Sequence, residues 1–385
     1  MNKKVHQKQT LQQNDITIIG AGFAGLACAR TAAAQGMKTV VLERKPCPGA
    51  NIRTTGILVQ EAADLLKLPK HLGRKISGVR LYSPKGKWID LNSPGYSFVA
   101  TDTQGMMRWL ADQAVMAGAE LRCSQNVSLF EQNTDGVVLP EVGMQSRFLV
   151  GCDGARSNVA RAFDLSSNNH YLMGAEAEYE GIRGLDQNRL HVFLDSKLAP
   201  GYIGWVVPGI GISQVGIAVR KSHKPDLAAF EQRISKLFDM GQAKVVGRRG
   251  GLIPCGGVLK RWHTDRVMLL GDAAGMVSPL TAGGIYPSLE LGAEAGLSIS
   301  RYLQGDLSHP SEPLNEIVPN YQMKKLMRWS MDHLAPPNAL YDLSLGNPVF
   351  QRIAQVLFFH HRGLFSAEAW KEILCIGHSP PEVIG

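Results

Sequence analysis

Three glycines and one glutamate carry the clearest chemical signal in the sequence. They are Gly20, Gly22, Gly25 and Glu43, within the segment DITIIGAGFAGLACARTAAAQGMKTVVLE. Gly20 permits a sharp turn, Gly22 removes the Cβ that would block a pyrophosphate, and Gly25 lets a helix approach a strand closely. Glu43 can accept hydrogen bonds from a ribose diol. These residue types at this spacing predict a binding site for an adenosine diphosphate group.

The elements around these residues have the order that such a site requires. The β-branched run 16–19 predicts a buried strand, residues 26–35 have apolar residues at helical spacing, and 39–42 predict a second strand. The start of the helix offers N–H groups and the positive end of its dipole to phosphates. A glycine-rich turn in an ordinary α/β fold is the alternative interpretation.

Two aspartates end later apolar strands in the same manner. Asp153 follows the strand expected at 148–150, and Asp272 follows the strand expected at 267–270. Asp272 can accept a hydrogen bond from a ribityl or ribose hydroxyl. The turn Gly283-Gly284 then opens a helix over 286–303, whose first N–H groups can face a pyrophosphate or a negatively charged ring.

The alternation of elements predicts an α/β fold in several parts. Residues 1–14 read as a disordered polar tail, and 15–165 as the first part of a nucleotide-binding domain whose strands join one sheet. Within 15–165 we expect a hairpin over 79–91, a helix over 101–118 and a strand over 127–130. Residues 166–264 are rich in strand patterns and predict an inserted, mainly antiparallel sheet domain. Residues 265–305 return to the nucleotide, and 306–385 predict a helical C-terminal region with proline breaks.

Composition excludes several classes of function. The formal net charge of +8 is not gathered in a block, so nucleic-acid binding is poorly supported. The six cysteines form no CxxC pair, so we expect no metal site, and the chain fits a reducing cytoplasm. No apolar window is long enough to span a membrane. Residues 321–329 mix basic and apolar side chains, which favours a helix packed on the core over a helix lying peripherally on a membrane.

Three separated motifs resemble one family. GAGFAGLACA, GCDGARSNVAR and LLGDAAGMVSPLTAGGIYPSLELGAEAG are similar to FAD-dependent oxidoreductases of the para-hydroxybenzoate hydroxylase type. The last motif resembles the geranylgeranyl reductase family, whose members typically read GDAAG, a proline, and then a glycine-rich turn ending in isoleucine. Typical aromatic hydroxylases have a histidine where this chain has Gly275.

The resemblance implies a Rossmann-like FAD-binding domain with an inserted substrate domain. It places ADP at the first motif, the flavin pyrophosphate near the second, the ribityl chain at Asp272 and the isoalloxazine at the Gly283–Ile285 turn. Arg53 either helps to hold a phosphate or the flavin, or is a surface side chain. The expected cofactor-binding residues are Gly20, Gly22, Ala24, Gly25, Glu43, Arg44, Arg53, Val127, Asp153, Asp272, Gly283, Gly284 and Ile285.

An aromatic run in the inserted domain carries the expectation for the substrate. Geranylgeranyl reductases have a Pro-x-x-Tyr-x-Trp-x-Phe-Pro pattern over the lipid pocket, and Trp205 and Pro208 fit it, with Tyr202 one position early. We expect Tyr202, Trp205 and Tyr286 to line the substrate site. Packing within the sheet domain is the alternative role for the first two. Archaeal members place a cysteine beside the flavin after an arginine, whereas this chain has Thr54 and Thr55.

The resemblance therefore implies an FAD-dependent reductase of carbon–carbon double bonds in an apolar, isoprenoid-like or prenyl-lipid substrate. No catalytic side chain is assigned, because the chemistry would be borne by the flavin. NAD(P)H or another donor would supply the electrons. The alternatives are an FAD-dependent monooxygenase or halogenase acting on an aromatic substrate and a prenyl-binding escort protein without catalysis.

Overall fold

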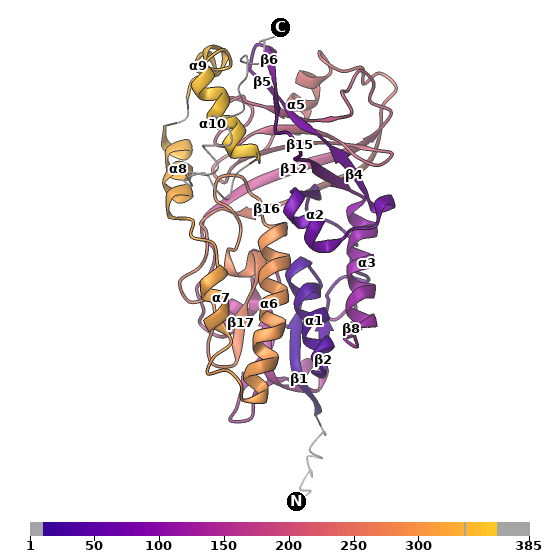
Figure 1. Cartoon of the computed structure of the whole chain (residues 1–385), viewed down its shortest axis with the longest axis vertical. Helices are drawn as coiled ribbons and strands as arrows, with labels where there is room; N and C mark the ends of the chain where they lie inside the picture. The colour runs from indigo at the N-terminus through magenta and orange to yellow at the C-terminus, as the bar shows by residue number, and fades with distance from the viewer. Residues whose placement is uncertain (1–10, 335, 360–385) are drawn as a thin grey trace, which may run out of the picture.

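Two large sheets occupy opposite halves of the molecule in the computed structural model, which describes residues 11–334 and 336–359. In Figure 1 the first sheet lies in the lower half, with β1, β2 and β17 behind α1 and α6. The second sheet lies in the upper half and contains β5, β6, β12, β15 and β16. The site described below is built where segments from both halves meet.

The first sheet has the parallel centre that a nucleotide-binding unit requires. Its strands run in the order β8, β2, β1, β11, β10 and β9, and β17 pairs with β11. The pairs β8–β2, β2–β1, β1–β11 and β11–β17 are all parallel. The strands span Glu120–Arg122 (β8), Thr39–Leu42 (β2), Gln12–Ile19 (β1), Met144–Gly151 (β11), Val137–Leu139 (β10), Glu131–Gln132 (β9) and Val267–Leu269 (β17).

Three helices pack beside this sheet because each has an apolar face. They are α1 (Phe23–Ala34), α3 (Thr103–Met116) and α6 (Ile285–Gln304), and α1 contacts both of the others. The strands are buried on both faces, with Ile16, Ile18, Val40 and Val41 fully inaccessible, as expected for a parallel sheet. The short helices α4 (Asn158–Ala162) and α7 (Ser311–Ile317) and the 3-10 turn η3 (Gly271–Ala274) complete this half.

Two local expectations about this half were wrong. Strand β1 begins at Gln12, before the expected strand 16–19 and inside the expected tail, because Gln12–Asn14 pair with residues 144–146 of β11. This part of the expected tail is therefore ordered by pairing that its polar sequence does not reveal. Residues 127–130 do not form the expected strand, and the neighbouring strand β9 spans only Glu131–Gln132.

The second sheet is antiparallel except at one pair. Its order is β16, β12, β15, β14, β13, β5 and β6, and only β13–β5 is parallel. The strands span Lys244–Pro254 (β16), Tyr171–Glu180 (β12), Ser213–Arg220 (β15), Gly204–Pro208 (β14), Arg189–Phe193 (β13), Gly78–Tyr82 (β5) and Trp88–Asn92 (β6). The hairpin β5–β6 thus extends this sheet, although its sequence position suggested the first sheet. Alternating patterns identify a hairpin but do not tell which sheet it joins.

Different elements pack against the two faces of the second sheet. Helix α5 (Leu227–Ile234) places Phe230 and Ile234 against one face. The other face carries Trp205 and Val207 and packs toward a small third sheet and the C-terminal helices. The third sheet contains β3 (Ile57–Leu58), β7 (Phe98–Thr101) and β4 (Gly73–Ile76), near α2 (Gln60–Leu66) and the turn η1 (Lys70–Leu72).

The chain continues after α6 into further short helices, as expected for the C-terminal region. They are α7, α8 (Gln322–His333), α9 (Asn338–Ser344) and α10 (Pro348–Phe359). Ala354 and Phe359 of α10 belong to the apolar cluster on the second sheet. Residues 360–385 of the expected C-terminal region lie outside the described residues. Within the described ranges, no helix has both the length and the apolar content to cross a membrane.

Candidate cofactor and substrate site

The first glycine turn is built by close backbone packing. Gly20 has φ +103°, and a Cβ there would lie 2.4 Å from the carbonyl oxygen of Cys152. A Cβ on Gly25 would lie 2.0 Å from the carbonyl oxygen of Gly20. Gly22 differs, because no atom lies within 4 Å of its Cβ position. Two glycines thus hold the turn against β11 and α1, and the third leaves open space in front of it.

Helix α1 begins directly beyond that open space. Gly22 is its N-cap residue and no side chain caps this end. The first N–H groups of a helix have no partners within the helix, and they attract anions together with the helix dipole. The turn therefore has the shape and polarity that a pyrophosphate requires.

Glu43 supports the same turn from the end of β2. Its Oε2 accepts a hydrogen bond from the backbone N–H of Ala21 at 2.8 Å, and its Oε1 accepts one from Lys45 N–H at 2.9 Å. The carboxylate is buried, yet each oxygen has a further lone pair. Sequence reasoning assigned Glu43 only to a ribose, whereas the structure shows that it also holds the glycine turn.

A cavity of about 240 Å³ opens in front of these residues. Of the expected cofactor residues, Gly20, Gly22, Glu43, Arg44, Arg53, Val127 and Asp153 line it. Phe23, Pro48, Gln125, Asn126 and Asn158 also line it and were not expected individually, because loop residues carry no periodic signal. Arg44, Lys45, Arg53 and Arg156 give the wall a cationic character that suits a diphosphate.

Asp153 presents an acceptor at this cavity. Its Oδ2 accepts hydrogen bonds from the N–H groups of Asn158 at 2.6 Å and Val159 at 3.2 Å, at the start of α4. Its Oδ1 is buried without a hydrogen-bond partner among the described residues. A buried acceptor without a donor is costly, and a hydroxyl group of a bound cofactor would satisfy it. The residues of the cavity thus fit an adenine dinucleotide.

Asp272 and the Gly283-Gly284 turn form a second group beside the first. Asp272 Oδ1 lies 3.6 Å from the Cβ position of Gly284, which is the N-cap of α6. The Asp272 side chain reaches solvent, yet the surrounding protein limits its hydration and raises the pKa of the carboxyl to about 6. Gly283, Gly284, Ile285 and Asp272 do not line the 240 Å³ cavity.

Ala24 connects the two groups without lining the cavity. The Cβ position of Gly271, next to Asp272, lies 3.2 Å from the Ala24 Cβ, and that of Gly292 in α6 lies 2.5 Å from the Ala24 carbonyl oxygen. The expected cofactor role of Ala24 thus coincides with a packing role between α1, η3 and α6. The small side chain lets these three elements meet at the end of the first sheet.

Two of the three expected substrate residues lie beside the second group, and the third lies on the second sheet. The Tyr202 hydroxyl donates to the carbonyl oxygen of Thr281 at 2.7 Å, and burial raises its pKa above the ordinary value. Tyr286, in the first turn of α6, donates to Glu290 Oε1. Trp205 is half-buried on the second sheet and donates from Nε1 to Glu176 Oε2 at 2.8 Å. Tyr202 and Tyr286 therefore flank the 281–285 loop, and Trp205 lies across the sheet.

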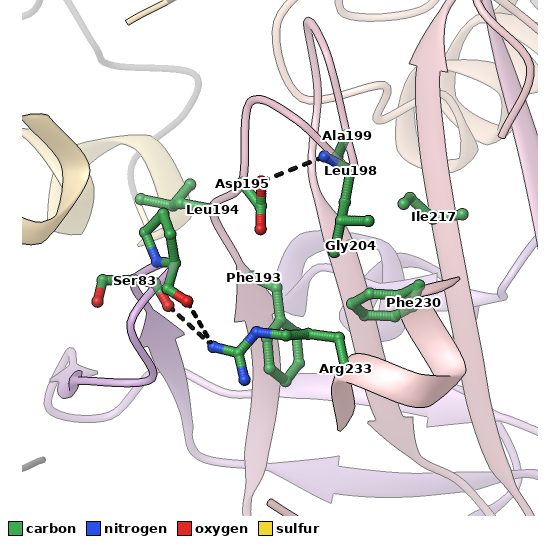
Figure 2. Close-up of a pocket in the computed structure, with 11 residues that line it drawn as sticks. Ser83, Phe193, Leu194, Asp195, Leu198, Ala199, Gly204, Ile217, Phe230 and Arg233 are labelled. Carbon is green, nitrogen blue, oxygen red and sulfur yellow. Dashed lines mark hydrogen bonds between the residues drawn. The ribbon is translucent and has the colours of Figure 1, made fainter. Parts of the chain in front are cut away.

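A small internal cavity elsewhere has no site character. It lies between α5 and the second sheet, has a volume of about 10 Å³ and is lined by Phe193, Ile217 and Phe230. Figure 2 shows Arg233 closing it by hydrogen bonds to the carbonyl oxygens of Ser83 and Pro84. A space of this size holds at most about one water molecule. Within the described residues, no group of three or more His, Cys, Asp or Glu side chains could hold a metal ion.

Comparison with known proteins agrees with the geometry. Residues 15–98 match the family described as FAD dependent oxidoreductase. The chain is 30% identical to digeranylgeranylglycerophospholipid reductase 2 of Methanopyrus kandleri, over 76% of this chain and 78% of that protein. It is 27% identical to the digeranylgeranylglycerophospholipid reductase of Methanocaldococcus jannaschii, over 83% of this chain and 85% of that protein.

Solved structures share the fold. A geranylgeranyl bacteriochlorophyll reductase-like protein from Thermoplasma acidophilum superposes with a TM-score of 0.80 at 19% identity, covering 95% of this chain and 96% of that one. A flavin-dependent brominase superposes with a TM-score of 0.69 at 16% identity, covering 94% and 97%. At these identities, the structural likeness concerns the fold alone.

Proposed function

Because this chain belongs to the digeranylgeranylglycerophospholipid reductase family of FAD-dependent oxidoreductases, we propose that it reduces carbon–carbon double bonds of an apolar isoprenoid-like substrate, a prenyl lipid. The similarity over most of the chain to proteins named as lipid reductases carries this proposal. Bound FAD would supply the hydride in its reduced form. NAD(P)H or another reductant would restore that form.

The residues of the chain would bind the cofactor in two places. Gly22, the first turn of α1 and the cationic wall of the cavity would hold the pyrophosphate, and Glu43 the adenosine ribose. Asp153 and Asp272 would accept hydrogen bonds from hydroxyl groups, and the Gly283–Ile285 turn would face the flavin ring. Arg44, Arg53 and Val127 would complete the walls.

The aromatic residues would position the substrate and keep water away from it. Trp205 offers a flat apolar surface, and Tyr202 fixes the turn before it to the 281–285 loop. Tyr202 keeps its proton at ordinary pH, since its pKa is raised and its hydroxyl donates to a carbonyl group. Excluding water strengthens the electrostatic interactions of such a site and protects a reactive reduced cofactor.

One experiment separates this proposal from its rivals. The purified holoprotein is reduced anaerobically, mixed with a geranylgeranylated glycerophospholipid, and followed by flavin reoxidation and lipid mass spectrometry. We expect reoxidation together with the addition of two hydrogen atoms per reduced double bond. Insertion of oxygen into an aromatic compound in air would instead indicate a monooxygenase. A protein that binds the lipid but no flavin would indicate an escort protein.

We also propose that the protein contacts a membrane peripherally from the cytoplasm. Helix α8 packs Met327 and Met331 on a buried cluster but exposes Leu326 at 57% and Trp329 at 52%, while Arg328 is only 4% exposed. One side of α8 thus packs on the core, as the sequence favoured, and its outer side carries exposed large apolar residues, which is unusual for a surface helix. We define the C-terminal apolar face as the exposed large apolar residues of 322–353, which are Met323, Leu326, Trp329, Leu334, Leu340, Leu343, Val349 and Ile353. Helices α8, α9 and α10 follow one another along one side of the molecule (Figure 1).

The charges around this face favour an anionic lipid surface. Asp332 is paired with Arg328, and Asp342 accepts a hydrogen bond from the Lys85 N–H, whereas Lys325 and Arg352 are exposed. A half-exposed tryptophan among basic residues is typical of a membrane interface.

Vesicle flotation tests this contact. The wild type is expected to float with phosphatidylglycerol vesicles, and the double variant Leu326→Asp/Trp329→Asp to remain in solution. Met116→Asp is the matched control, because Met116 is 80% exposed on α3, outside the face. Equal flotation of all three proteins would contradict the proposal. A wild-type dimer that the double variant disperses would assign the face to a second copy.

A further inference from the structure

Four residues form one lateral row across the second sheet. The strand pairing places Arg249 of β16 beside Glu176 of β12, Glu176 beside Gly216 of β15, and Gly216 beside Trp205 of β14. Residues that are paired in this way point to the same face of a sheet. This face is opposite the one that α5 covers. The row therefore lies on the side that faces the rest of the molecule.

Gly216 allows Trp205 to reach Glu176 across one strand. A Cβ on Gly216 would lie 2.3 Å from Cε2 of Trp205, so the indole lies flat over this glycine. The indole thereby crosses one strand, and its Nε1–H reaches Glu176 Oε2 at 2.8 Å. Any larger residue at position 216 would block this path. The orientation of Trp205 thus depends on two neighbours: Gly216, which has no side chain, and Glu176, which accepts the indole hydrogen bond.

Glu176 gathers hydrogen bonds from three separate segments. Its Oε1 accepts from Arg249 Nε at 2.7 Å, and its Oε2 accepts both from Trp205 and from Thr55 Oγ1 at 2.5 Å. The Glu176 residue is only 4% exposed. Thr55 directly follows Arg53 and Thr54, which line the 240 Å³ cavity. Glu176 therefore joins the cavity loop to the aromatic surface.

We propose that Glu176 is a positioning residue that fixes the Trp205 indole relative to the 53–55 loop. The inference rests on the proposed function, in which Trp205 lies against the substrate and the loop lies against the cofactor. Glu176 then sets the distance between the substrate's double bond and the flavin. Displacing a reacting group by about one ångström can cost as much as ~100-fold in rate.

An ionised carboxylate suits this position because all the groups facing it are donors. An amide has one acceptor oxygen and one donor nitrogen, so Glu176→Gln must turn an N–H toward either Arg249 or Trp205. Glu178 provides the matched control. It accepts a hydrogen bond from Arg249 Nη1 at 2.7 Å, and within the described part of the chain it bonds neither Trp205 nor Thr55. Glu178→Gln therefore removes one charge beside Arg249 without touching the indole.

The first readout is independent of activity. The chain has six tryptophans, so indole ¹⁵N–¹H spectra of the labelled holoprotein are simple, and Trp205→Phe identifies the Trp205 signal. We expect Glu176→Gln to shift this signal and Glu178→Gln to leave it in place. A Trp205 signal that stays in place in Glu176→Gln would overturn the inference, even if the proposed function were wrong.

The second readout is turnover with the prenyl lipid. We expect Glu176→Gln to keep its FAD content and lose roughly tenfold or more in kcat, with a smaller change in KM. Gly216→Ala, which displaces the indole without changing charge, should show the same loss, so a folding failure of the first variant does not remove the test. Glu178→Gln should stay within about twofold of the wild type.

The outcomes separate the two proposals. A wild type that never reduces a prenyl lipid contradicts the proposed function, while the indole spectra still decide the role of Glu176. A shifted indole signal with unchanged turnover in both Glu176→Gln and Gly216→Ala would contradict the positioning role. Equal losses in Glu176→Gln and Glu178→Gln would assign the effect to charge and not to position.

Discussion

At the scale of single residues, the three glycines of the first turn have separate roles. Gly20 and Gly25 are required because a Cβ at either position meets backbone atoms. Gly22 has φ −83° and ψ −174°, an extended conformation that any residue adopts, and its Cβ position is open. The fold therefore does not require a glycine at position 22, and we propose that the ligand does.

This distinction gives the first prediction. Gly22→Val should keep the unfolding free energy of the apoprotein and lose FAD binding, because the new side chain projects into the cavity. Gly25→Val should instead lower the unfolding free energy by about 1–3 kcal/mol or more, since it clashes with Gly20. Urea unfolding of the apoproteins and flavin content after gel filtration measure the two effects. A Gly22→Val protein with full flavin content would show that the turn does not hold the pyrophosphate.

His191 is a buried titratable residue outside the site. It has no exposed surface, its Nδ1 accepts from the Tyr82 hydroxyl at 3.0 Å, and its Nε2–H donates to the Asp186 carbonyl oxygen at 2.9 Å. Burial lowers the pKa of His191 from 6.5 to about 4. The neutral ring is thus part of the core between β5 and β13, and protonating it in the folded state is unfavourable.

The second prediction follows from this pKa. Between pH 6.5 and about pH 4, His191 is protonated in the unfolded chain but neutral in the folded chain. Its full contribution to the unfolding free energy is therefore present above pH 6.5 and is lost as the pH decreases. Lowering the pH from about 7.5 to about 5 should remove about 2 kcal/mol of unfolding free energy through His191. Asp272, whose pKa is raised, changes the unfolding free energy in the opposite direction as the pH decreases. The measurement is therefore the difference between wild type and His191→Gln in urea unfolding, and an equal pH slope in both would contradict the assignment.

Single residues were also the scale at which sequence reasoning was most informative and most incomplete. Gly20, Gly22 and Glu43 could be found because their spacing follows from one compact strand–turn–helix unit. Glu176 could not, because its partners Thr55, Trp205 and Arg249 are brought together only by strand pairing. Residues that function through long-range register leave no local pattern.

At the scale of elements, α1 and α6 are packed almost backbone to backbone. The Cβ position of Gly292 lies 2.5 Å from the Ala24 carbonyl oxygen, and that of Gly296 lies 2.5 Å from the Cys28 carbonyl oxygen. Glycine in a helix costs about 1 kcal/mol relative to alanine. The two glycines are nevertheless needed here, because only a residue without a side chain lets α6 contact the backbone of α1 directly.

The third prediction tests this packing. Gly292→Val should lower the unfolding free energy by about 1–3 kcal/mol, because the gain in helix propensity is smaller than the cost of separating α1 from α6. Arg301→Ala, at an exposed position of the same helix, should change it by less than about 0.5 kcal/mol. Urea unfolding of both variants provides the measurement. A more stable Gly292→Val protein would show that the helices can separate without loss.

The elements themselves could largely be predicted, but their assembly could not. The helices expected near 26–35, 101–118 and 286–303 appear as α1, α3 and α6 with boundaries close to those expected. Their apolar residues repeat with the helical period, which is a local property. The hairpin expected over 79–91 is also present, but its membership of the second sheet depends on β13, which lies far along the chain.

At the scale of the whole molecule, the cofactor cavity lies where loops of the first half reach the second sheet. Arg53 lines the cavity, and its Cβ lies 3.7 Å from the Cβ position of Gly251 in β16. Thr55 bonds Glu176 of β12. A bound cofactor would therefore order a loop that both halves share.

The fourth prediction concerns removal of that cofactor. Stripping FAD should lower the melting temperature, and restoring it at about 100 times its Kd should return about 2.7 kcal/mol of unfolding free energy. FMN, which lacks the adenosine half, should restore much less, because the described cavity is the part that fits this half. Thermal unfolding with each flavin is the measurement. Equal rescue by FMN would contradict the adenosine assignment.

During synthesis, β5 and β6 leave the ribosome long before β13 is made. Gly78–Tyr82 can pair with β6 at once, but its other edge stays open until Arg189–Phe193 arrives, because that pairing is parallel and distant in sequence. Contacts of this kind slow folding, and an open strand edge invites association with other chains. A fragment limited to residues 166–264 would leave β13 with the same open edge. The second sheet is therefore a late product of folding that depends on the first half, and it is not a module that can be excised.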